Sequence, residues 1–88
     1  MTSMFIKTVY ISGFTPQTAK PLVHLASQYV SDIYLEYQNR KINVKSIMGI
    51  LSLGSMKDEM TLTAKGLDEY EAIKAIGAAL EQTEIRPA

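Results

Sequence analysis

A hairpin pattern in the middle of the chain constrains the fold more than any other feature. The run DIYLEY (32–37) alternates apolar and polar residues, which predicts a half-buried strand. KINV (41–44) follows after a short polar turn, in which we expect Asn39 to take positive φ. These two segments therefore predict neighbouring antiparallel strands.

The other patterned segments complete the order βαββαβα. They are a strand at 4–11, a helix ending near 28, a short helix between Ser46 and Gly54, a strand at 60–65 and a helix at 68–82. Asp58 and Glu59 are expected in a turn before the fourth strand, and the acidic group at 68–71 is read as a helix start only. Strands and helices mix without a repeated βαβ rhythm. The order predicts an α+β fold with a four-stranded antiparallel sheet and three helices on one face.

Two prolines compete to define the start of the first helix. Thr15-Pro16 has the form of an N-cap followed by a first-turn proline. Pro21 would then lie inside the helix, where it removes a hydrogen bond and clashes with the preceding turn at a cost of about 3 kcal/mol. We therefore expect regular helix to begin near Lys20, with an irregular loop over 13–19.

Composition excludes several classes of function. The chain has 88 residues, 47% of them hydrophobic, and a formal net charge of zero, so charge provides no case for nucleic acid or an anionic membrane. It has no cysteine and one histidine, which argues against disulfides, thiolate chemistry and a histidine metal site. No secretion signal is recognisable. We expect one domain over residues 1–88, located in the cytoplasm.

The segment NVKSIMGILSLG (43–54) carries a specific resemblance to the HPr family, the phosphocarriers of the bacterial sugar phosphotransferase system. Further runs in the same register are HLASQY (24–29), DIYLEY (32–37) and LTAKGLDEYEAI (62–73), so the resemblance covers about residues 4–83. It implies the family's open-faced sandwich, with connectivity βαββαβα. That is the element order inferred from the patterns alone.

The loop before the first helix departs from the family pattern. By resemblance, the phosphorylatable histidine falls at Thr15, the phosphate-neutralising arginine at Gln17 and the following proline at Thr18. A threonine hydroxyl needs an activating base, and its ester is a poor phosphoryl donor. Gln17 lacks the charged fork of arginine, and Pro16 removes a backbone N–H from the helix start. These losses argue against carrier chemistry, in the manner of Crh, the HPr-like regulator that lacks the active histidine.

Ser46 has a structural and a functional interpretation. Structurally it is an N-cap, which stabilises a helix by about 1 kcal/mol. By resemblance it is the serine that HPr kinase/phosphorylase modifies, and phosphate there would add about −1.5 to −2 charges. The helix after it is too short to bury all of its apolar residues. We expect Ile47, Met48 and Leu51 to form a partner-docking patch, with Ile50 and Leu53 in the core.

Three basic residues are candidates for the rim of that patch. Lys20 and Lys45 are ordinary solvated charges by default, but both are expected near the docking face, where they can pair with acidic groups of a partner. His24 is expected on the outer or lateral side of its helix, two turns from Thr15, as an interface residue and not as a relocated phosphoacceptor.

Together these features predict a regulatory binding protein that is not an enzyme and needs no cofactor or metal. By resemblance its partners are HPr kinase/phosphorylase and a LacI-type catabolite control transcription factor. Direct nucleic-acid or membrane binding is not expected, and the chain is expected to be a monomer or weak dimer. Two rivals remain: a phosphocarrier with an unorthodox acceptor, and a divergent paralogue that acts only as a binding domain.

Overall fold

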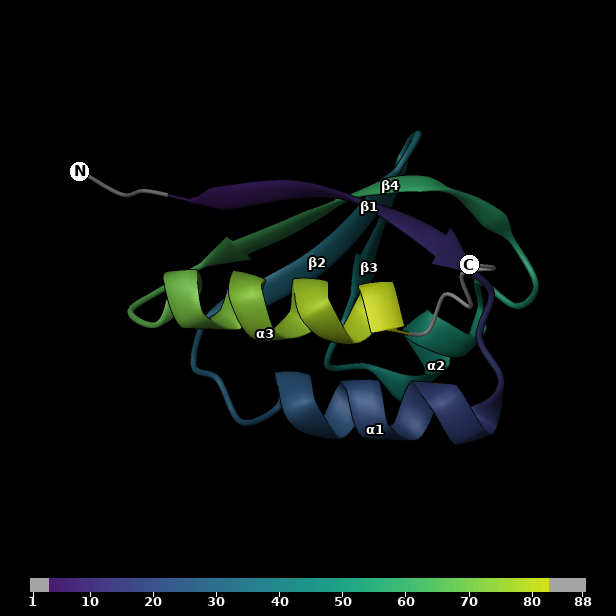
Figure 1. Ribbon diagram of the computed structural model, residues 1–88, viewed down its shortest axis with the longest axis horizontal. Coiled ribbons are helices and arrows are strands. Elements are labelled where there is room, and N and C mark those ends of the chain that lie inside the picture. Colours follow the sequence, from purple (N-terminus) through teal and green to yellow (C-terminus); the bar gives the residue numbers. More distant parts are fainter. Residues whose placement is uncertain (1–3, 83–88) are drawn as a thin grey trace.

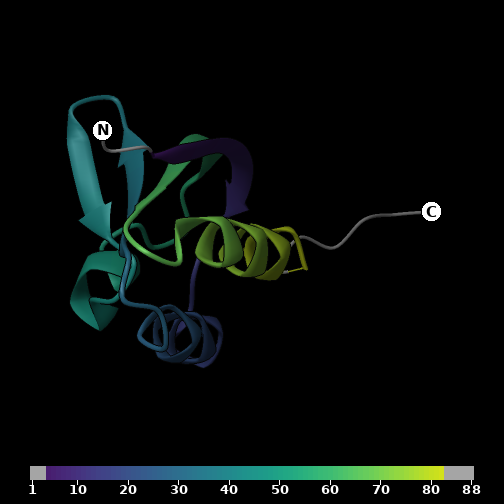
Figure 2. The ribbon, with the colours of Figure 1, turned by 90° about the vertical axis from the view of Figure 1, so that its left-hand side faces the viewer.

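The computed structural model describes residues 4–82 of the chain. Its four strands form one antiparallel sheet. The strand order is β1-β4-β2-β3, and the three helices lie on one face of the sheet (Figure 1, Figure 2). The elements are β1 (Phe5–Ser12), α1 (Pro16–Ala26), β2 (Asp32–Tyr37), β3 (Arg40–Asn43), α2 (Ile47–Leu51), β4 (Lys57–Lys65) and α3 (Glu69–Gln82). The expected α+β open-faced sandwich is confirmed. No helix in this part of the chain is both long and apolar enough to cross a bilayer.

The β2–β3 hairpin forms as expected, but its turn differs by one residue. Tyr37 pairs with Arg40, so the two central turn residues are Gln38 and Asn39. Gln38 takes the positive φ, at 54°, and the expectation for Asn39 is wrong. The register of the flanking strands decides which residue must enter the left-handed region, and here it overrides the intrinsic preference of asparagine.

Strand β4 begins three residues earlier than its apolar pattern suggests. Asp58 pairs with Ile11 and Glu59 with Tyr10, so the expected turn at 58–59 is wrong. Because β1 continues to Ser12, it offers backbone partners over this length, and pairing outweighs the poor strand propensity of acidic residues.

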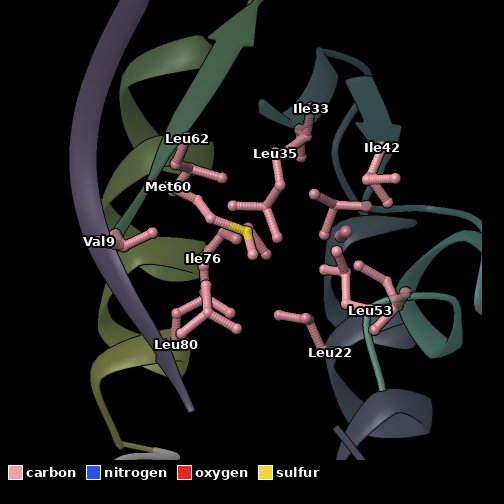
Figure 3. Close-up of a cluster of buried hydrophobic side chains, with 14 of the residues drawn as sticks. Val9, Leu22, Ile33, Leu35, Ile42, Leu53, Met60, Leu62, Ile76 and Leu80 are labelled. Carbon is pink, nitrogen blue, oxygen red and sulfur yellow. The ribbon is translucent and has the colours of Figure 1, made fainter. Parts of the chain in front are cut away.

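The core lies between the sheet and the helix layer (Figure 3). On β1, Val9 and Ile11 face inward. Ile50 and Leu53 are buried as expected. Each fully buried aliphatic side chain stabilises the fold by about 1.5–3 kcal/mol, so this layer contributes most of the stabilising free energy.

Helix α1 is regular and continuous from Pro16 to Ala26, so the expected late start at Lys20 is wrong. Pro21 lies inside the helix with its ring exposed to solvent. Ala19, Leu22 and Ala26 are buried, and this spacing requires unbroken helix through Pro21. Burial of that stripe, together with a capped N-terminus, offsets the single hydrogen bond that the proline removes.

Asp68 does more than begin a helix. Its carboxylate accepts hydrogen bonds from Val30 N at 3.0 Å, Ser31 N at 3.0 Å and Ser31 Oγ at 2.5 Å. The Ser31 hydroxyl is the main cause that holds the pKa of Asp68 below its usual value, and the two backbone donors act in the same direction. Asp68 thus joins the α1–β2 loop to the start of α3, and the interpretation of 68–71 as a helix start only is wrong.

Replacing Pro21 should stabilise the protein. Pro21→Ala restores the donor that α1 lacks, and we expect a gain on the order of 1–3 kcal/mol in the free energy of unfolding, measured in urea. Pro16→Ala is the matched control, because proline is well tolerated in the first turn of a helix. Equal effects of the two substitutions would contradict this account of α1.

Asp68→Asn should destabilise the protein at neutral pH. The lowered pKa of Asp68 means that its contribution is fully present above the unfolded-state value of about 3.9 and is lost as pH falls through the folded-state value. Thermal unfolding from pH 3 to pH 7 should therefore show a weaker acid dependence in the variant than in the parent. Glu71→Gln, on the exposed side of the same first turn, is the control. A D68N protein with the parent's stability at pH 7 contradicts the assignment.

Candidate functional site: the α1–α2 face

The loop between β1 and α1 is hydrogen-bonded to the backbone of the segment that follows α2. Phe14 N donates to Gly54 O at 2.6 Å, and the Phe14 side chain is buried. Gly13 has φ +89°, and a Cβ there would lie 3.1 Å from both Gly54 O and Ser55 Cα. A side chain at position 13 is therefore disfavoured by both conformation and space. This contact fixes the start of α1 next to the end of α2.

Thr15, the residue at which the sequence analysis expected the phosphoacceptor position to fall, acts as the N-cap of α1. Its Oγ1 accepts from Thr18 N at 3.4 Å, and Thr15 N donates to Thr18 Oγ1 at 2.9 Å. This reciprocal pair is a capping box built from two threonines. Within residues 4–82 the Thr15 side chain hydrogen-bonds only with Thr18, so no carboxylate or imidazole is placed to activate it.

Ser46 caps α2, as expected. Its Oγ accepts from Gly49 N at 3.1 Å, and the residue is half-buried. Gly49 is packed tightly, since a Cβ there would lie 3.2 Å from Ile42 Cγ2. Ser46 is therefore a half-buried cap at the start of a short helix that is packed closely against β3.

Of the three apolar residues expected in the docking patch, one is strongly exposed and two are partly buried against the core. Met48 is 75% exposed, which makes it the apolar side chain most available to a partner on α2. Ile47 and Leu51 are half-buried and pack against the core. The patch is thus centred on Met48, with the other two at its base.

The three expected basic residues have different environments. Lys20 and His24 are exposed one turn apart on α1. Lys45 is half-buried, and its Nζ donates to Tyr29 O at 2.6 Å. Lys45 is therefore not the freely solvated charge that was expected by default. It joins the start of α2 to the loop that follows α1.

Sequence reasoning missed Arg40 as part of this region. Its Nη2 donates to Ser52 Oγ at 2.9 Å, and that hydroxyl in turn donates to Gly49 O at 2.5 Å. The link joins the β2–β3 hairpin to the C-terminal end of α2, between residues twelve apart in sequence. No local pattern signals such a contact.

The α1–α2 face is basic overall. Helix α2 lies beside α1 (Figure 1, Figure 2), and neither helix contains an acidic residue. Lys20, His24, Arg40 and Lys45 all belong to these helices or contact their ends. Such a surface fits an acidic partner. Among residues 4–82 no group of three or more His, Cys, Asp or Glu side chains is placed to hold a metal.

Comparison with known proteins agrees with this geometry. The family model described as the PTS HPr component phosphorylation site matches residues 7–82. A phosphocarrier protein HPr from Bacillus anthracis is 34% identical with a TM-score of 0.80, covering 89% of this chain and 98% of its own. The histidine-containing phosphocarrier protein of a Mycoplasma is 28% identical with a TM-score of 0.80, covering 90% and 94%.

Crh, the catabolite repression protein of Bacillus subtilis, is similar to the same degree. It is 36% identical with a TM-score of 0.73, over 86% of this chain and 88% of Crh. Fold and sequence together define an HPr-like open-faced sandwich protein. The chain belongs to the HPr family, and it resembles Crh as well as the phosphocarriers.

The two lysines should respond differently to loss of charge. Lys45→Met removes a charged hydrogen bond to a backbone carbonyl, and we expect it to lower the free energy of unfolding by about 1–2 kcal/mol. Lys20→Met, on the exposed side of α1, should change it by less than about 0.5 kcal/mol. Urea unfolding measures both. If the two variants are equally stable, the Lys45–Tyr29 contact does not stabilise the protein.

Proposed function

We propose that this protein is a regulatory interaction protein of the phosphotransferase system and carbon catabolite control, and not a histidine phosphocarrier. The observation that carries the proposal is the state of Thr15. At the family's phosphoacceptor position there is a hydroxyl that serves as a helix cap, and no imidazole. The residue has a structural role that explains its presence without phosphotransfer.

The surroundings of Thr15 support the same conclusion. Gln17 replaces the arginine of the family pattern and is exposed, so no guanidinium is available at this position to neutralise a phosphoryl group. Pro16 contributes no N–H to the helix start. Phosphorylation of Thr15 would also modify the same hydroxyl oxygen that accepts the capping hydrogen bond from Thr18 N. This one loop therefore lacks the family's phosphoryl acceptor, its positive charge and one of the backbone N–H donors of the helix start.

In this proposal Ser46 is the switch. A phosphoryl group there would add about −1.5 to −2 charges two residues from the exposed Met48. The surrounding face is basic and apolar, so this charge would change which partners the face attracts. The docking residues are Lys20, His24, Lys45, Ile47, Met48 and Leu51.

The partners follow from the family. HPr kinase/phosphorylase would modify Ser46, and a LacI-type catabolite control transcription factor would read the modified face. The protein would act in the cytoplasm as a single domain, without enzymatic activity, cofactor or metal. Neither nucleic acid nor membrane would be a direct partner.

Two parallel reactions test the proposal. Incubation with HPr kinase/phosphorylase and ATP should add about 80 Da to the intact protein, and Ser46→Ala should abolish the addition. Incubation with phosphoenolpyruvate and the system's histidine-directed kinase should add nothing. An authentic HPr, run alongside, must be modified in both reactions.

Each rival has its own outcome. An acid-labile adduct in the phosphoenolpyruvate reaction identifies a working phosphocarrier and contradicts the proposal. No adduct in either reaction leaves the divergent binding domain, without a Ser46 switch. An adduct that persists in S46A places the modification elsewhere and removes Ser46 as the switch.

A further inference from the structure

Methionine is the only sulfur-containing side chain of this protein, because the chain has five methionines and no cysteine. A thioether is oxidised by direct contact between its sulfur and a dissolved oxidant, so the rate follows exposure to solvent. Among residues 4–82, Met48 is 75% exposed and Met4 is 49% exposed. Met56 is partly buried, and Met60 is buried in the core. Exposure therefore predicts that Met48 is oxidised first.

Met48 also lies where a chemical change has a large effect on the surface of α2. It is the strongly exposed member of the docking patch, and its neighbours Ile47 and Leu51 are partly buried against the core. Ile50, on the same helix, is fully buried. Because these other side chains make the contacts that hold α2, a polar atom on the Met48 sulfur would change the surface and leave the helix in place.

We propose that Met48 is a reversible oxidation site, at which a peroxide makes the docking patch polar. In the forward step the Met48 sulfur attacks the nearer oxygen of the peroxide, so that an S–O bond forms and the O–O bond breaks. The sulfur loses two electrons and becomes a sulfoxide, and the peroxide is reduced to an alcohol or to water. A methionine sulfoxide reductase reverses the step: the oxygen leaves as water while two thiols of the reductase become a disulfide.

The sulfoxide would weaken docking because it must lose bound water before a partner can cover it. A thioether is apolar and flexible, which lets a methionine surface adapt to a partner. A sulfoxide is polar, and burying a polar group without a hydrogen-bond partner is unfavourable. Since Met48 is the one strongly exposed apolar side chain of α2, no other residue of this helix replaces the apolar surface that oxidation removes.

Oxidation of Met48 and phosphorylation of Ser46 would act on one surface by different physical means. Phosphate would add about −1.5 to −2 charges at the start of α2, and salt would screen its effect on partners. The sulfoxide would add a dipole without net charge, so its effect would depend little on salt. The effect of oxidation on docking rests on the proposed function. The preference of the oxidant for Met48 does not, because it depends only on exposure.

Graded treatment of the folded protein with hydrogen peroxide, followed by peptide mapping, tests the site. Each oxidation adds about 16 Da to a peptide. Met48 should be modified first, and Met60, the buried internal control, should be modified last. Methionine sulfoxide reductases A and B together should remove the added mass. Any other methionine among residues 4–82 that reacts as fast as Met48 overturns the proposal, as does a Met48 sulfoxide that the reductases leave in place.

Two measurements separate a change of surface from a change of fold, at the peroxide dose that modifies Met48 alone. Urea unfolding of the oxidised protein should match that of the reduced parent, because Met48 is a surface side chain. Retention on a phenyl hydrophobic-interaction column should fall on oxidation. Met48→Leu should show no fall, because leucine is not oxidised, whereas the matched control Met4→Leu should show the parent's fall. Unchanged retention of the parent, or an equal fall in M48L, overturns the proposal.

The rate of Ser46 phosphorylation tests the effect on docking. After catalase has removed the peroxide, HPr kinase/phosphorylase and ATP should modify the oxidised parent at least about fivefold more slowly than the reduced parent, the loss typical of an interface side chain that contributes to binding. Reductase treatment should restore the rate, and peroxide should leave the rate of M48L where it was. Equal rates for the oxidised and the reduced parent overturn the effect on docking.

A failure of the proposed function gives a different result. If the reduced parent is not phosphorylated on Ser46, the kinase does not recognise this protein and the proposed function is contradicted. The order of oxidation, its reversal and the column retention are measured without the kinase. The assignment of Met48 as a reversible oxidation site is then decided by these three results.

Discussion

The contact between the β1–α1 loop and the end of α2 is the constraint on which the site depends. The hydrogen bond from Phe14 N to Gly54 O joins two segments forty residues apart, and Gly13 is the residue that lets their backbones approach. Because β1 is held by the sheet and Gly54 ends the α2 segment, this contact sets Thr15, α1 and α2 in one surface. That surface presents two capped helix starts, at Thr15 and at Ser46.

Local patterns predicted most of this architecture because the periodic burial of apolar residues is strong. Strand alternation located β2, and the buried stripe Ala72, Ile73, Ile76 and Leu80 located α3. The predictions were wrong where tertiary packing or strand pairing outweighed a local sequence preference. Pro21 was expected to delay the start of regular helix to about Lys20, yet the helix runs unbroken from Pro16 and buries Leu22 and Ala26. At Asp58 and Glu59, pairing with β1 overrode turn propensity.

The candidate site was predictable in part. Ser46 as a cap and Ile50 as a core residue follow from short-range spacing, and both are confirmed. The links from Arg40 to Ser52, Lys45 to Tyr29 and Asp68 to Ser31 join separate elements through side-chain hydrogen bonds. Such contacts depend on how elements are positioned in three dimensions, so no pattern within one segment reports them. The resemblance to HPr indicated the surface, but not which of its charges are engaged within the protein.

The central claim is that phosphate reaches this protein on serine and not on histidine. Phosphorus NMR of the protein purified from its own cells, combined with mass mapping, tests it most directly. The account predicts a phosphomonoester signal that maps to Ser46 and no phosphoramidate. A phosphorus–nitrogen signal that maps to His24, the only histidine of the chain, would contradict it.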